Sequence, residues 1–173
     1  FNCQGQTDPV IGGAFENRDF IYISMPEHIN ATDTTAGWNK LGQKLIITGT
    51  IFQHDGVTPA KDVILDYYQT DADGYYRNSH DLDQRVSRHG YLRGWVKTDT
   101  DGKYAIHTIR PGAYPNRNEP AHIHATIKEP SIDVPYYIDE LVFDDDRLLT
   151  TAKRRALPNR GGSGVLRVLE MFL

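Results

Sequence analysis

Short runs of β-branched and aromatic residues, broken by turn dipeptides, dominate this 173-residue chain. Such runs suit the pleated surface of a sheet, and Asp-Gly or Pro-Gly pairs favour tight reversals of the chain. The turn pairs are Asp55-Gly56, Asp73-Gly74, Asp101-Gly102 and Pro111-Gly112. The runs predict strands at Lys44–Gln53, Val63–Gln69, Tyr91–Thr98, Tyr104–Ile109, His122–Ile127, Ile138–Phe143 and Val165–Phe172. Short strands at this spacing predict an all-β fold, an antiparallel β-sandwich with little helix.

One domain accounts for the length and the composition. With 39% hydrophobic and 24% charged residues, the chain has the ordinary composition of a globular protein. Residues 44–173 are expected to form the sandwich domain. Residues 1–43 mix polar residues with glycine, and we expect them to form an extended N-terminal arm without a domain of its own. Thr150–Leu157 is the stretch with fair helix propensity.

Charge, hydropathy and cysteine content exclude several classes of protein. The net charge of −4 and the lack of a basic stripe argue against a nucleic-acid partner. No apolar run approaches the roughly 20 residues of a membrane span. Cys3 is the only cysteine, so the chain has no internal disulfide and no cysteine cluster for a metal. Residues 1–6 read like the end of a removed leader, which favours an exported protein (periplasmic, extracellular or lipid-anchored) over a cytoplasmic one.

Two histidines and a tyrosine form a candidate metal site. Successive strand side chains point to opposite faces, so His122 and His124 would share a face and could chelate one ion. Tyr114 lies in the turn-rich segment 111–116, where its side chain can be held in place as a third ligand. Phenolate with imidazole suits Fe(III) better than Zn(II), which prefers cysteine, histidine and carboxylate. His-x-His pairs also occur at sheet edges simply as hydrogen-bonding residues.

A longer set of motifs resembles the intradiol ring-cleavage dioxygenases. The resemblance runs from about residue 45 to about residue 145, and it includes Gly49-Thr50-Ile51, Gly74-Tyr75-Tyr76-Arg77, Pro111-Gly112-Ala113-Tyr114-Pro115 and Pro120-Ala121-His122-Ile123-His124. In that family two tyrosinates and two histidines hold a non-haem Fe(III). The resemblance therefore implies four iron ligands, namely Tyr76, Tyr114, His122 and His124. Tyr75 is the competing choice for the first tyrosine.

The resemblance also implies an activity for residues 44–173 as a catalytic domain. A catechol would bind through both oxygens, and both atoms of O2 would enter a cis,cis-muconate-type diacid, cleaved between the two hydroxyl-bearing carbons. Tyr114 would leave when the substrate binds and act as an internal base, while Tyr76 would stay. The implied partners are a small catechol and O2, and the chain could assemble as a homo-oligomer.

Two carboxylates depart from the family pattern. Glu119 stands where family members usually carry an arginine that stabilises the substrate anion. Arg117 or Arg110, both near the motif, could supply the missing charge, or both could be surface arginines. Glu140 lies near a position where a neutral polar residue is common, or it could be a solvent-facing strand residue. Tyr114, Glu119 and Arg117 are therefore the candidate catalytic residues.

Two other functions compete with the dioxygenase interpretation. The strands and turns also resemble metal-free sandwich modules of the transthyretin-like or carboxypeptidase-regulatory-like kind, in which the glycines and prolines only build turns. Such a binding module has no reason to combine Tyr76 with the two histidines. A zinc hydrolase is least favoured, because the sequence shows no convincing carboxylate beside the histidines.

Overall fold

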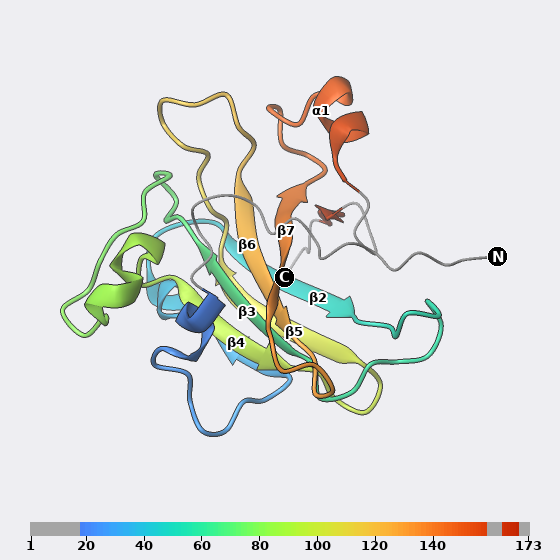
Figure 1. Cartoon of the computed structure of the whole chain (residues 1–173). Helices are drawn as coiled ribbons and strands as arrows, with labels where there is room; N and C mark the ends of the chain where they lie inside the picture. Colours follow the sequence, from blue (N-terminus) through green and yellow to red (C-terminus); the bar gives the residue numbers. More distant parts are fainter. Residues whose placement is uncertain (1–17, 159–163, 170–173) are drawn as a thin grey trace.

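Two sheets pack face to face in the computed structural model of the chain, which describes residues 18–158 and 164–169 (Figure 1). The smaller sheet has the order β1-β5-β2, built from Thr32–Thr34, Lys103–Ile109 and Lys44–Thr50. The larger sheet has the order β4-β3-β6-β7-β8, built from Arg93–Lys97, Ile64–Gln69, His122–Lys128, Tyr136–Phe143 and Val165–Leu166. The strand pairs are antiparallel except β1 with β5 and β7 with β8, which are parallel. The predicted all-β sandwich is confirmed.

The predicted strands all occur, with shifted ends. β2 stops at Thr50 rather than Gln53. Ile51 still donates its N–H to the carbonyl of Gly102, but the partner strand β5 begins only at Lys103, after the Asp101-Gly102 turn. β8 has only two residues, and the last four residues of the chain lie outside those described. The predicted helix is α1 (Thr151–Ala156), where the Thr150 hydroxyl caps the first turn by accepting from the N–H of Lys153.

The segment before β2 is more than an extended arm. It holds the 3-10 helix η2 (Arg18–Tyr22), the strand β1 and a second 3-10 helix, η3 (Ala36–Asn39). Phe20 and Ile21 of η2 are buried. These residues have no separate core, and the domain boundary at residue 44 stays a prediction. Cys3 and the leader-like start lie outside the described residues, so the export prediction also stays open.

Strand β3 is buried on both faces and so separates two apolar clusters. Leu65 and Tyr67 point between the sheets, where they pack with residues such as Ile47 of β2 and Ile106 of β5. Tyr68 points the other way, into a cluster completed by Phe20, Ile21 and Val86. The outer face of the larger sheet is therefore covered around β3, and polar side chains there, such as His124, are shielded from water.

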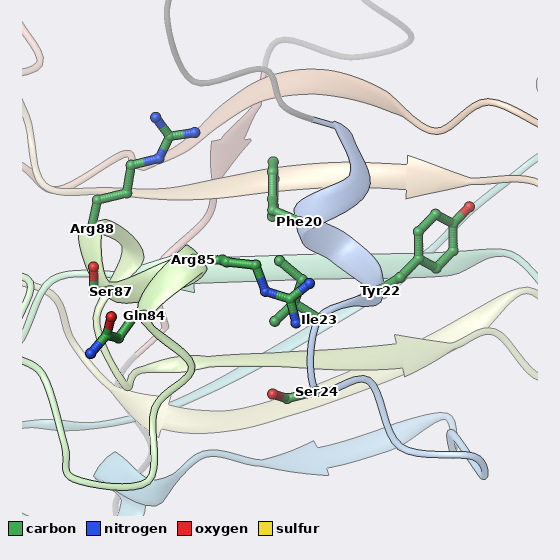
Figure 2. A pocket seen from close by; sticks show the side chains of 8 residues that line it. All are labelled: Phe20, Tyr22, Ile23, Ser24, Gln84, Arg85, Ser87 and Arg88. Carbon is green, nitrogen blue, oxygen red and sulfur yellow. The ribbon is translucent and has the colours of Figure 1, made fainter.

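Helix η2 and a third 3-10 helix, η4 (Gln84–His89), provide this cover. A hollow of about 750 Å³ lies between them (Figure 2). Its lining residues are Phe20, Tyr22, Ile23, Ser24, Gln84, Arg85, Ser87 and Arg88, and none of them is a predicted metal ligand. Across the described residues, the helices are too short and too polar to span a membrane.

Candidate metal centre

The loops that carry Tyr76 and Tyr114 touch through two glycines. Gly74 has a φ of +85°, and a Cβ at this position would lie 2.1 Å from the carbonyl oxygen of Ala113. A Cβ at Gly112 would lie 2.6 Å from the backbone nitrogen of Gly74. Glycine is the residue that tolerates both the left-handed conformation and so close an approach. The two tyrosines are thus brought to one place by backbone contact.

Strand β6 supplies the two histidines from its outer face. His122 and His124 are 5% and 2% exposed, so both imidazoles are withdrawn from water. Their rings lie edge to face, with centroids 4.9 Å apart. Tyr68 of β3 pairs with His124 across the strands and stacks on its ring. The alternation of strand side chains therefore gives the shared face that the sequence predicts.

The four predicted ligands converge through their donor atoms. The hydroxyl oxygens of Tyr76 and Tyr114 are 2.7 Å apart. His122 Nε2 lies 3.1 Å from the Tyr114 oxygen, and His124 Nε2 lies 2.9 Å from the Tyr76 oxygen. Donors that share one ion at bond lengths of about 2.0–2.2 Å are separated by about this much. Two phenol oxygens and two imidazole nitrogens form a donor set that suits a hard, oxidised ion such as Fe(III).

Each histidine is held by its other ring nitrogen. His122 Nδ1 lies 2.8 Å from the carbonyl oxygen of Pro120. His124 Nδ1 lies 2.6 Å from the hydroxyl of Tyr137, on β7. Such outer partners fix the orientation of a metal-binding imidazole and raise its basicity. Tyr137 was not predicted as a site residue, because nothing in the spacing of β7 marks it as a partner of His124.

The hydrogen bonds around the centre have one consistent direction. A carbonyl can only accept, so His122 donates from Nδ1 and its Nε2 accepts from the hydroxyl of Tyr114. The Tyr114 oxygen then accepts from Tyr76, the Tyr76 oxygen accepts from His124 Nε2–H, and His124 Nδ1 accepts from Tyr137. A cation would displace both phenol protons, and the proton of His124 would move to Nδ1 to free Nε2. Metal uptake at this centre should therefore release protons.

Burial controls the protonation of these groups. It raises the pKa of Tyr76, as does the hydrogen bond that Tyr76 donates to Tyr114. Burial also raises the pKa of Tyr114 above its ordinary value, against the opposing hydrogen bond from Tyr76. The pKa of His124 is lowered well below its ordinary value by burial and by the nearby His122. Without a cation the rings of Tyr76, Tyr114 and His124 are thus neutral.

The competing tyrosine and the other histidines lie apart from the four donors. Tyr75 is 49% exposed, and the guanidinium of Arg77 covers its ring at 5.4 Å. His54 and His80 are exposed. His89, at the end of η4, is fully buried and stacks on the far side of Tyr68, with ring centroids 4.1 Å apart. It supports the ring that packs on His124 and does not itself reach the donor atoms.

The charged residues that the sequence marks as candidate catalytic residues, Arg117 and Glu119, lie at the exposed edge of the site. The Arg117 guanidinium lies 5.3 Å from the centroid of the Tyr114 ring, and its Nη1 is 3.8 Å from Glu119. Arg117 and Glu119 are both exposed. Arg110 points elsewhere, because it forms a bidentate ion pair with Asp145.

Glu140 corrects one expectation. The sequence showed no convincing carboxylate beside the histidines, and this was wrong: Glu140 of β7 has Oε1 3.9 Å from His122 Nε2. Ligand atoms of His122, His124 and Glu140 all lie within 4.8 Å of one another. Burial raises the pKa of Glu140, while His122 acts in the opposite direction.

Comparison with known proteins decides the family. The family model Dioxygenase_C, described as a dioxygenase, matches residues 16–157, which is most of the chain. The chain belongs to the intradiol ring-cleavage dioxygenase family. The resemblance that the tyrosine and histidine motifs indicated is thereby confirmed. The match also argues against a metal-free transthyretin-like module.

Characterised relatives are distant and longer. The chain is 31% identical over 93 residues to the beta chain of protocatechuate 3,4-dioxygenase from Burkholderia cepacia, covering 50% of this chain and 39% of the relative. It is 25% identical over 146 residues to 6-chlorohydroxyquinol 1,2-dioxygenase from Cupriavidus pinatubonensis, covering 75% of this chain and 49% of the relative. The chain thus spans half or less of these two proteins.

Solved structures share the fold. Hydroxyquinol 1,2-dioxygenase from Pseudomonas putida DLL-E4 superposes with a TM-score of 0.57 at 24% identity, covering 84% of this chain and 51% of that one. The dioxygenase domain of a carbohydrate-binding fusion from Streptomyces sp. SirexAA-E gives a TM-score of 0.55 at 23% identity, covering 82% and 76%. At this identity the likeness concerns the fold alone.

Proposed function

We propose that this protein is a non-haem Fe(III) intradiol dioxygenase that cleaves a catechol between its two hydroxyl-bearing carbons. The observation that carries the proposal is the convergence of four donor atoms from strand β6 and two loops, each within about 3 Å of the next. Membership in the dioxygenase family supports it. The proposed ligands are Tyr76, Tyr114, His122 and His124.

The donor set fits ferric iron. Tyrosinate oxygens are hard anionic donors, and two of them would offset most of the charge of Fe(III). The two imidazoles present Nε2 to the centre while their Nδ1 atoms are held by Pro120 and Tyr137. Iron bound there would draw electron density from a chelated catecholate and so open a ring carbon to attack by dioxygen.

Tyr114 is the residue proposed to move a proton. Its hydroxyl lies between Tyr76 and His122, and the chain that follows it, residues 115–119, is exposed, so a substrate can reach this side of the centre. Once ionised, the Tyr114 oxygen can accept the proton of a catechol hydroxyl. Tyr76 is held between Tyr114 and His124 and is proposed to stay in place. The positive charge of Arg117 over the Tyr114 ring favours the ionised phenol.

Iron content, colour and oxygen uptake test the proposal. The purified protein, loaded with Fe(III), should bind about one iron per chain and absorb visible light through tyrosinate-to-iron charge transfer, and the band should shift when catechol is added. Oxygen uptake should accompany formation of a muconate-type product. A colourless protein without iron after ferric loading would overturn the proposal.

Variants separate the proposed ligands from their neighbours. His122→Ala should lose the iron, whereas His80→Ala, at an exposed histidine, should keep it. Tyr76→Phe should change the visible band, and Tyr75→Phe should leave it unchanged, because Tyr75 is half-exposed and lies apart from the four donor atoms. The reverse result for the two tyrosines would show that the wrong one had been assigned.

A further inference from the structure

An extra residue in β7 places two side chains at the metal centre. Thr126 of β6 pairs with Tyr137, and His124 pairs with Glu140, so two residues of β7 oppose the single residue Ala125. In a regular strand, residues three apart point to opposite faces. The bulge brings Tyr137 and Glu140 to the same face, as bulges near active sites commonly re-aim side chains.

The bulge contains a residue with unusual backbone geometry. Asp139 has a φ of +77°, a region that residues other than glycine rarely occupy and that aspartate tolerates better than most. The bulge places two polar side chains beside the histidines. Tyr137 reaches Nδ1 of His124, and Glu140 lies on the Nε2 side of His122. The local distortion therefore serves the centre on two sides at once.

We propose that Glu140 is a fifth donor of the metal centre, an inference that rests on the proposed function. Its Oε1 lies 3.9 Å from His122 Nε2, close enough for both atoms to reach one ion at bond lengths of about 2.0–2.2 Å. The side chain is 42% exposed, which leaves it free to make the small rotation that binding needs.

A carboxylate at this position changes what the centre can hold. Together with the two tyrosinates it makes three anionic donors, whose summed charge of about −3 balances the charge of Fe(III). Together with His122 and His124 alone it makes a set of two histidines and one carboxylate, a combination that binds divalent metals. Glu140 should thus tighten metal binding in general and not only ferric iron.

Metal competition with Glu140→Gln tests this inference. The substitution keeps the size of the side chain and removes the anionic donor. In competition with a chelator, the variant should bind Fe(III) at least about tenfold more weakly than wild type does. Its visible band and its electron paramagnetic resonance signal should both differ from those of wild type. Glu27→Gln, the same change at an exposed glutamate, is the matched control and should behave as wild type. Circular dichroism checks that each variant is folded.

The same comparison with Zn(II) separates this inference from the proposed function. If wild type binds Fe(III) with a charge-transfer band and Glu140→Gln matches it within twofold for both metals, Glu140 is not a donor and the proposed function stands. If wild type takes Zn(II) but no Fe(III), the proposed function fails, and a loss of Zn(II) affinity in Glu140→Gln still supports the fifth donor. Wild type that binds neither metal overturns both.

Discussion

The ring of Tyr68 lies stacked on the imidazole of His124, with centroids 4.4 Å apart and an interplanar angle of 16°. His89 stacks on the opposite face of Tyr68, so the proposed ligand is the end of a three-ring column. The column fixes the plane of the His124 ring, while the Tyr137 hydroxyl fixes its rotation. The ligand is therefore positioned by packing from the other strands and not by β6 alone.

Replacing Tyr68 should loosen His124 without touching the metal. Tyr68→Leu removes the stacked ring and should cost less stability than the about 3–5 kcal/mol of an aromatic-to-alanine change, because leucine refills part of the space. We expect a lower melting temperature and weaker iron retention in the folded fraction. Tyr68→Phe keeps the ring and should keep the iron and the colour. Equal iron retention in folded Tyr68→Leu would show that the stack does not position the ligand.

Two of the three Asp-Gly turns, at Gly56 and Gly74, provide a matched test of the loop contact. Gly74 and Gly56 both have positive φ, +85° and +74°. A Cβ added at Gly74 would collide with backbone, whereas a Cβ added at Gly56 would have no neighbour within 4 Å. Gly56→Ala should cost about 1 kcal/mol of stability from backbone strain alone. Gly74→Ala should cost several times more and should also alter the visible band, because it displaces the loop of Tyr76. Denaturant unfolding of both variants, with absorption spectra, measures the difference.

Much of this arrangement could be predicted from particular residues. The alternation of β6 predicts that His122 and His124 share a face, and the motifs around Tyr76 and Tyr114 point to the same family. Glu140 and Tyr137 could not be placed, because a one-residue bulge reverses the facing of every later strand position and leaves no mark in the alternation.

The first strand and the cover over the larger sheet were also beyond prediction. Strand β1 is the three-residue polar segment Thr32–Thr34, which has no apolar pattern and is defined by its pairing with β5. Helix η2 is a short 3-10 turn whose Phe20 is buried by contacts with Tyr68 and His89. Both features depend on contacts between residues far apart in the sequence.

The buried His89 should make the stability of the fold pH-dependent. Both of its ring nitrogens lack a hydrogen-bond partner among the described residues, and burial lowers the pKa of His89 to about 3. The unfolded chain takes up this proton near pH 6.5, whereas the folded protein resists it until near pH 3. The contribution of neutral His89 to the free energy of unfolding is therefore fully present above pH 6.5. It is lost as the pH falls below that value, by up to about 1.4 kcal/mol per pH unit.

His89→Phe isolates this contribution, because it keeps an aromatic ring between Phe20 and Tyr68. The other titrating groups are common to both proteins and cancel in the difference. Urea unfolding between pH 4 and 8 should show wild type losing stability relative to the variant on the acid side. Parallel curves across this range would show that His89 is not held neutral in the fold.

Glu119 should bias the proposed activity against catechols that carry a second acidic group. Two unit charges about 4 Å apart interact by about 4 kcal/mol at an effective dielectric of 20. Glu119 is half-exposed and lies near Arg117, so screening leaves only a fraction of that value. Even so, its charge raises the pKa of Tyr114, as does that of Glu140.

We therefore predict weak turnover of protocatechuate and better turnover of uncharged or hydroxylated catechols. Glu119→Arg should raise kcat/KM for protocatechuate several-fold, because it replaces repulsion of the ring carboxylate by attraction. For catechol itself the change should be small, since that substrate has no carboxylate to repel. Steady-state oxygen uptake over a small panel of catechols, compared at low and high salt, measures this, and a wild-type preference for protocatechuate would refute the electrostatic argument.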